Sequence, residues 1–114
     1  MPLKINQSPT FFWPVTVMIP VDGGRFDKQT FDVEFARLSV SDAEKLVTSI
    51  ATGERTEFDG YRDMIKGWRG VVDDGADVPF SETTLKQLLE IPTVGPAVLA
   101  AYKEATSEVA RRKN

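Results

Sequence analysis

The sequence predicts a small, single-domain α+β protein with an N-terminal antiparallel β-hairpin followed by about four α-helices. Near the N-terminus, apolar and polar residues alternate in two segments separated by a glycine pair, whereas further along apolar residues recur three or four positions apart. The length of 114 residues fits one domain that is stable without metals or disulfides. We assign residues 1–10 to an irregular lead-in, 11–38 to the hairpin and 41–112 to the helical part.

The two hairpin strands are expected at residues 13–21 and 31–37, where every second side chain is apolar. Gly23 and Gly24 lie between them and accept the positive φ angles of a tight turn. Pro14 and Pro20 cannot donate ladder hydrogen bonds, so the first strand must present them at an edge or near its ends. Two strands suffice for this pattern. An isolated hairpin is marginally stable, so the helices or a second copy must cover it, and we expect some self-association.

The first two helices follow the hairpin. Ser41 and Glu44 form a predicted capping box, and Gly53 ends the first helix. Its apolar stripe consists of Ala43, Leu46, Val47 and Ile50. The second helix is expected where apolar and aromatic residues recur at helical spacing, namely Phe58, Tyr61, Met64, Ile65 and Trp68.

A tight turn and two further helices complete the chain. The turn is expected at Asp73-Asp74-Gly75-Ala76-Asp77. Ser81 is the predicted N-cap of the third helix, which buries Leu85, Leu88 and Leu89 and ends before Pro92. Thr93 is the predicted N-cap of the last helix, with Pro96 in its first turn. The apolar face of that helix consists of Val94, Val98, Ala101, Tyr102, Ala105 and Val109.

Composition excludes several classes of function. Seventeen acidic and 14 basic residues give a net charge of −3, which disfavours nucleic acid as a partner. The apolar stretches are too short to span a bilayer and the N-terminus lacks the features of a signal peptide, so we expect a cytosolic protein with no membrane partner. Histidine and cysteine are absent, and with them the usual nucleophile and base pairs and the commonest zinc ligands. We therefore expect neither enzymatic activity nor a cofactor or metal.

Carboxylates are the remaining candidates for chemistry. Asp59 and Asp63 lie four apart on the predicted second helix with Glu57 nearby, a set that could in principle hold magnesium or calcium. Acids on the polar face of an amphipathic helix are usually only solvated, which is the reading we favour. The aspartates of residues 73–77 lack the spacing of an EF-hand loop, and turn geometry alone accounts for them.

The segment from Gly67 to Ser81 is the most distinctive part of the chain and contains no reactive side chain. We expect Trp68 and Phe80 to be core residues that anchor the two ends of its turn, because aromatic area dominates burial energetics. Tyr102 is expected to be a core residue for the same reason. The segment therefore identifies an architecture and not an active site.

The order of these parts resembles the tail assembly chaperones of long-tailed bacteriophages and prophages, over nearly the whole chain. Its sharpest part is a motif expected to be structural, made of Trp68, Gly70, Val71, Gly75, Val78, Pro79, Phe80 and Ser81. Leu85, Leu88, Leu89 and Tyr102 follow it. The N-terminal pattern of Pro9, Phe12, Trp13, Pro14 and Val15, then Phe31, Phe35 and Leu38, is also similar.

The resemblance implies a non-enzymatic protein of the host bacterial cytoplasm. It would bind the long helical tape measure protein, keep it soluble, help to recruit tail tube (major tail) subunits, and be absent from the mature virion. Binding an exposed apolar stripe calls for a hydrophobic groove between helices. We expect that groove between the third and last helices, lined by Leu85, Leu88, Val98, Tyr102, Ala105 and Val109. The alternative is that these side chains belong to the internal core.

Two other functions stay open at this point. A structural tail or head-tail completion protein would share the phage setting but stay in the particle. A small metal-dependent hydrolase would need Glu57, Asp59 and Asp63 to bind a divalent ion.

Overall fold

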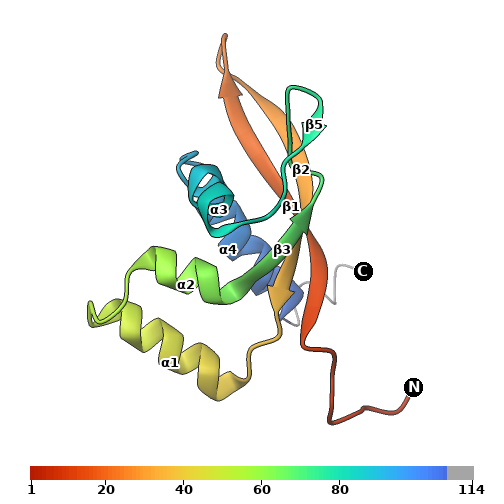
Figure 1. Cartoon of the computed structure of the whole chain (residues 1–114), viewed down its shortest axis with the longest axis vertical. Helices are drawn as coiled ribbons and strands as arrows, with labels where there is room; N and C mark the ends of the chain where they lie inside the picture. The colour runs from red at the N-terminus through yellow and green to blue at the C-terminus, as the bar shows by residue number, and fades with distance from the viewer. Residues whose placement is uncertain (108–114) are drawn as a thin grey trace.

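The computed structural model describes residues 1–107 and confirms the predicted fold class, an antiparallel β-hairpin with four helices in one small α+β domain. Figure 1 shows the long hairpin, with a third strand beside it and the helices on one side. In chain order the elements are β1 (Thr10–Val21), β2 (Arg25–Ala36), α1 (Val40–Ala51), α2 (Glu57–Met64), β3 (Ile65–Arg69), β4 (Val72–Asp73), β5 (Ala76–Asp77), α3 (Glu82–Leu89) and α4 (Val94–Ala105).

The β1–β2 hairpin is longer than predicted, with 12 residues in each strand. Gly23 and Gly24 have φ angles of 84° and 72°, as expected for its turn. Its register places Val15 opposite Phe31, and both side chains are buried on the face against which α4 packs. Residues 25–30 are exposed on both faces, so they lack the alternation by which a half-buried strand is recognised in a sequence.

A third strand occupies the end of the predicted second helix, so the expectations of a helix through Trp68 and of two strands alone are wrong. Helix α2 ends at Met64, and the following segment pairs antiparallel with β2, with Trp68 opposite Val33. Glycine disfavours a helix, and Gly67 also leaves room for β2, since a Cβ atom there would lie 2.7 Å from Glu34 Oε1. Ile65 and Trp68 are residue types that suit a strand.

The predicted start of the first helix is wrong by two residues. Ser39, and not Ser41, is the N-cap of α1: its backbone is extended and its hydroxyl accepts a hydrogen bond from the Asp42 amide. Ser41 lies inside the first turn. The predicted end is confirmed, since Gly53 follows the C-cap with a φ of 79°.

The C-terminal part follows the prediction closely. The turn at residues 73–77 joins β4 to β5, with positive φ at Asp74 and Gly75. Ser81 is the N-cap of α3, where it forms a capping box with Thr84. Thr93 is in the N-cap position of α4 but makes no side-chain cap hydrogen bond. The expected continuation of this helix to residue 112, including Val109, lies outside the described residues.

The core lies between the inner face of the sheet and helices α3 and α4. Its largest fully buried side chains are Phe35, Leu85, Val15, Val33, Val94 and Val98. In contrast, α1 contributes a single buried residue, Leu46. Within residues 1–107, no helix combines the length and apolar character needed to cross a membrane.

Candidate functional site: an apolar groove between α1, α2 and α4

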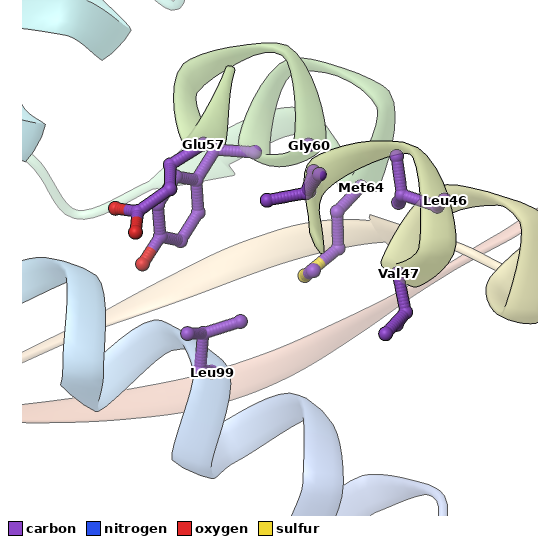
Figure 2. Close-up of a pocket in the computed structure, with 8 residues that line it drawn as sticks. Leu46, Val47, Glu57, Gly60, Met64 and Leu99 are labelled. Atoms are coloured by element: carbon purple, nitrogen blue, oxygen red, sulfur yellow. The ribbon is translucent and has the colours of Figure 1, made fainter. Parts of the chain in front are cut away.

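An open apolar groove of about 280 Å³ lies between α1, α2 and α4 (Figure 2). Helix α1 provides one wall, α2 the floor and α4 the other wall. The lining residues are Leu46, Val47, Ile50, Glu57, Gly60, Tyr61, Met64 and Leu99. We call this feature the α1–α2–α4 groove.

Two glycines allow the helices to approach closely enough to form the groove. A Cβ atom on Gly60 would lie 2.6 Å from Ile50 Cδ1, so the absence of a side chain here lets Ile50 pack close to the backbone of α2. A Cβ atom on Gly95 would lie 2.8 Å from the Tyr61 hydroxyl oxygen, so the Tyr61 ring is seated against the first turn of α4. Both glycines are buried.

The side chains at the mouth of the groove are apolar and uncovered. Val47 is 68% exposed and Leu99 38%, and Figure 2 shows both projecting into the space between α1 and α4. Beneath them, Leu46 and Met64 are buried. Part of the predicted apolar stripe of α1 thus packs on α2, while Val47 on the same stripe has no cover among the described residues.

Polar groups in the groove come from α2. Among the described residues that line the groove, Glu57 provides a carboxylate and Tyr61 a phenol hydroxyl. Burial raises the pKa of Tyr61, and the charge of Glu57 raises it further. Tyr61 therefore stays protonated at neutral pH and can donate a hydrogen bond. The arrangement suits an apolar ligand with a polar or cationic group near Glu57.

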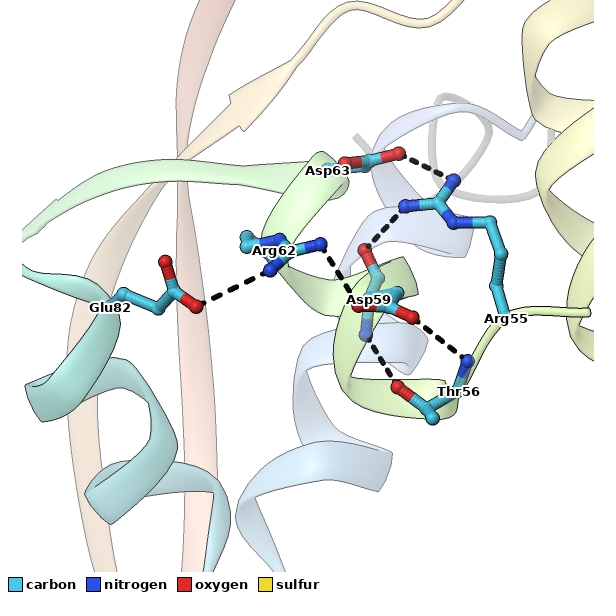
Figure 3. Close-up of polar contacts among 6 residues, drawn as sticks. All are labelled: Arg55, Thr56, Asp59, Arg62, Asp63 and Glu82. Carbon is cyan, nitrogen blue, oxygen red and sulfur yellow. Dashed lines mark hydrogen bonds and ion pairs between the residues drawn. The ribbon is translucent and has the colours of Figure 1, made fainter.

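Two of the three carboxylates considered as metal ligands, Asp59 and Asp63, are engaged in a different role, shown in Figure 3. Asp59 and Thr56 form the capping box of α2, and Asp59 also pairs with Arg62 at 2.9 Å. Asp63 pairs with Arg55 at 2.7 Å. Arg62 extends the network to Glu82 on α3, at 3.3 Å.

These contacts shift the pKa values of the network. The backbone hydrogen bond from Thr56 is the main cause of the lowered pKa of Asp59, and the hydrogen bond from Arg55 is the main cause for Asp63. Asp63 in turn raises the pKa of Arg55. Among residues 1–107 there is no group of three potential ligands that could hold a metal ion.

Within residues 1–107, the residues predicted to bind the partner differ in burial, and Tyr102 and Ala105 line a separate pocket together with Phe11. Leu85 and Val98 are each only 1% exposed and belong to the core, so neither is available to a partner in this conformation. Leu88, Tyr102 and Ala105 are partly buried. The Tyr102 ring packs edge-on against Phe35, with ring centroids 5.2 Å apart. Val109 lies outside the described residues.

Trp68 and Phe80, expected to be core residues at the two ends of the motif from Gly67 to Ser81, are partly buried and contact each other. Trp68 and Phe80 pack edge to face with centroids 5.0 Å apart, and Trp68 Nε1–H donates to the Val78 carbonyl at 2.8 Å. Gly70 has a φ of 85°, which favours glycine. The motif thus closes the connection from β3 to α3, and no side chain of it lines the α1–α2–α4 groove.

Sequence reasoning missed the groove because its members are spread over three helices. The stripe of α1 was recognised, but nothing indicated that Val47 would stay uncovered. One signal was Gly60, because a glycine inside a helical pattern weakens the helix but permits close approach of another chain segment. Leu99 directly follows the buried Val98 and lies outside the apolar face predicted for the last helix, so the helical spacing did not single it out.

No protein-family model matches the sequence, and neither a curated protein nor a solved structure gives a significant match.

Proposed function

We propose that this chain is a tail assembly chaperone of a long-tailed phage or prophage. In this proposal it binds the tape measure protein in the bacterial cytoplasm, keeps it soluble and helps to recruit tail tube subunits. The observation that carries the proposal is the α1–α2–α4 groove, whose uncovered side chains, Val47 and Leu99, lie beside a folded core. The resemblance of the ordered motifs adds to it and supplies the identity of the partner.

An amphipathic helix is the ligand that the groove fits best. Helix-in-groove recognition lays the apolar face of a helix against walls made by other helices. A stripe laid over Val47 and Leu99 would remove both from water, a gain that a small polar ligand cannot match. Glu57 and the Tyr61 hydroxyl would contact polar residues that flank the stripe. The tape measure protein that the resemblance implies as partner is long and helical, so it would present such apolar stripes repeatedly.

Aspartate substitutions at the groove mouth test the proposal. We expect Val47→Asp and Leu99→Asp to fold normally, since both side chains are exposed, but to leave a co-expressed tape measure protein insoluble. The measurements are thermal unfolding of each purified variant and the soluble fraction of the tape measure protein.

Val40→Asp is the matched control. Val40 is also on α1 and is 78% exposed, but it does not line the groove. This variant should keep the tape measure protein soluble. If the groove variants fold normally and keep the tape measure protein as soluble as the control does, the α1–α2–α4 groove is not its binding site.

A structural tail or head-tail completion protein is the alternative, and detection of the chain in purified virions would favour it.

A further inference from the structure

We infer that Glu57 gives the α1–α2–α4 groove a charge preference: the groove binds an amphipathic helix that carries a lysine or arginine at one end of its apolar stripe. The ligand is taken to be a helix, as in the proposed function, on which this preference rests. The chemistry of the groove wall identifies the class of helix, whichever protein supplies it.

Helix α2 has two faces that differ in their surroundings. The residues of its groove face occupy positions i, i+3, i+4 and i+7 and so share one side of the helix. They are Glu57, Gly60, Tyr61 and Met64. The other charged residues of α2, namely Asp59, Arg62 and Asp63, belong to the ion-pair network of Figure 3 and do not line the groove. Glu57 is therefore the charged residue of α2 that faces the groove.

The carboxylate of Glu57 is not used by the fold. Within residues 1–107 it forms no ion pair and no hydrogen bond, whereas Asp59 and Asp63 on the same helix pair with arginines at 2.9 Å and 2.7 Å. An acidic residue in the first turn favours a helix through its dipole. Asp59 already fills that role and completes the capping box as well, so the start of α2 does not depend on Glu57 alone.

The rest of the groove wall offers no compensating positive charge. Among the described residues that line the groove, none is a lysine or an arginine, and all except Glu57 and Tyr61 are apolar. Charge of one sign in a concave site with low-dielectric walls attracts ligands of the opposite sign. A cation on the ligand is therefore favoured beside Glu57, and a carboxylate there is disfavoured.

Tyr61 adds a second attraction for a cation. It follows Glu57 by four residues on α2, which places the two side chains next to each other. Burial raises the pKa of Tyr61 and the charge of Glu57 raises it further, as expected for neighbouring groups. An ammonium or guanidinium group paired with Glu57 lies close to an aromatic ring, with which cations interact favourably.

The two sides of the groove differ, and this difference specifies where the ligand carries its cation. Helix α1 contributes three aliphatic side chains, Leu46, Val47 and Ile50. Figure 2 shows Val47 and Glu57 on opposite sides of the groove. A ligand helix that covers both has an apolar residue over Val47 and its cation near Glu57. The lysine or arginine thus belongs at one end of the stripe, and the ligand binds in a single direction.

Three synthetic helical peptides with the same leucine stripe test the preference. They carry lysine, glutamine or glutamate at one end of the stripe, and titration calorimetry measures their affinities for the purified full chain. We expect the lysine peptide to bind about three-fold more tightly than the glutamine peptide, as is usual for a partly exposed ion pair, and the glutamate peptide to bind most weakly. Added salt should reduce these differences. Equal affinities of the three peptides would overturn the inference.

A matched pair of charge reversals locates the preference. Glu57→Lys should make the glutamate peptide the tightest ligand. Glu44→Lys changes the net charge by the same amount, but Glu44 lies on α1 outside the groove, so this variant should still prefer the lysine peptide. Both glutamates are exposed, and neither substitution removes a contact of the described fold. If the two variants lost the preference equally, net charge would explain it and the inference would be wrong.

The charge preference and the helix-binding groove fail in distinguishable ways, and Val47→Asp separates them. If this variant binds none of the peptides while the unmodified chain binds all three equally well, the groove binds helices and only the charge preference is wrong. If no peptide binds, or if Val47→Asp binds them as well as the unmodified chain does, the groove is not a helix site and both are wrong.

Two further outcomes concern the source of the ligand. If the unmodified chain alone forms dimers that Val47→Asp dissociates, a second copy fills the groove and the inference is overturned. If the peptides behave as expected but the unmodified chain does not keep the tape measure protein soluble, the charge preference stands and the chaperone function is wrong.

Discussion

The sheet, α3 and α4 form one half of the molecule, and α1 and α2 form the other; the two halves are packed very differently. All of the largest fully buried side chains, Phe35 and Leu85 among them, lie in the sheet half. Helix α1 buries only Leu46 and leaves Val47 68% exposed. Stability is therefore concentrated in the sheet half, and the α1–α2 half keeps apolar surface available beside it.

Three contacts connect α1 and α2 to each other and to α3. Gly60 permits close contact with Ile50, Arg55 in the connecting loop pairs with Asp63, and Arg62 reaches Glu82 on α3. These contacts connect α1 to α2 and α2 to α3, and none of the ion-paired residues lines the space between α1 and α4. A groove whose walls are already in place before the ligand binds loses little conformational entropy on binding, which favours affinity.

Replacing a leucine by alanine, once in each half, should give the largest loss of stability and show the contrast between the halves most clearly. Leu85→Ala should lower the free energy of unfolding by about 3 kcal/mol, because it leaves a closed cavity in the sheet half. Leu46→Ala should cost at most about 2 kcal/mol, because its site borders the open groove and water can enter the space. Urea unfolding of both variants measures the difference.

Leu89→Ala serves as a control within α3, since its partly buried side chain should give an intermediate cost. The contrast between the halves would be refuted if Leu46→Ala were as destabilising as Leu85→Ala. That result would mean that α1 is an integral part of the core and that the groove is filled in solution.

The local elements could largely be predicted from the sequence, because each has its own signal. The glycine pair of the hairpin turn, the capping residue Ser81 and the Asp74-Gly75 turn all depend on residues close in the chain. Strand β3 could not be predicted, because Phe58 to Trp68 also fit a helical period and only pairing with Val33 decides between the two.

The candidate site was predictable only in part. The stripe of α1 was visible, but an apolar stripe does not reveal whether it is covered, since that depends on where distant helices lie. Leu85 and Val98 lie on stripes of the same kind and are buried, whereas Val47 is open. Whether such a side chain is buried depends on the tertiary arrangement of the helices, which the spacing of apolar residues along one helix does not reveal.

The connection from β3 to α3, within the sheet half, gives the next largest effect. Trp68→Phe keeps an aromatic ring against Phe80 but removes the hydrogen bond to the Val78 carbonyl. We expect a loss of between about 1 and 2 kcal/mol, since a partly buried carbonyl is left without its donor. Thermal or urea unfolding measures it.

Trp13→Phe is the matched control for this change. Trp13 is also partly buried against the core, but its Nε1 has no hydrogen-bond partner within residues 1–107. Its replacement should therefore cost less than that of Trp68. Equal losses for the two variants would show that ring size, and not the hydrogen bond, secures the connection from β3 to α3.

The smallest expected effect concerns the ion pair that holds the α1–α2 loop, and it depends on pH. The hydrogen bond from Arg55 lowers the pKa of Asp63 in the folded chain. Such a carboxylate stabilises the fold above its unfolded pKa of about 4, and the contribution is lost as pH falls through the lower folded value. Asp63→Asn should thus be less stable than the unmodified chain at pH 7.

The difference should stay below about 1 kcal/mol, because the two side chains are 31% and 43% exposed and water screens the pair. It should shrink below about pH 4, where protonation removes the charge from the unmodified chain as well. Urea unfolding of both proteins across this range gives the difference directly, and Asp59, whose pKa is also lowered, contributes equally to both. A difference that grows on acidification would show that Asp63 is not held by Arg55, and the loop would then need another explanation for its position against α2.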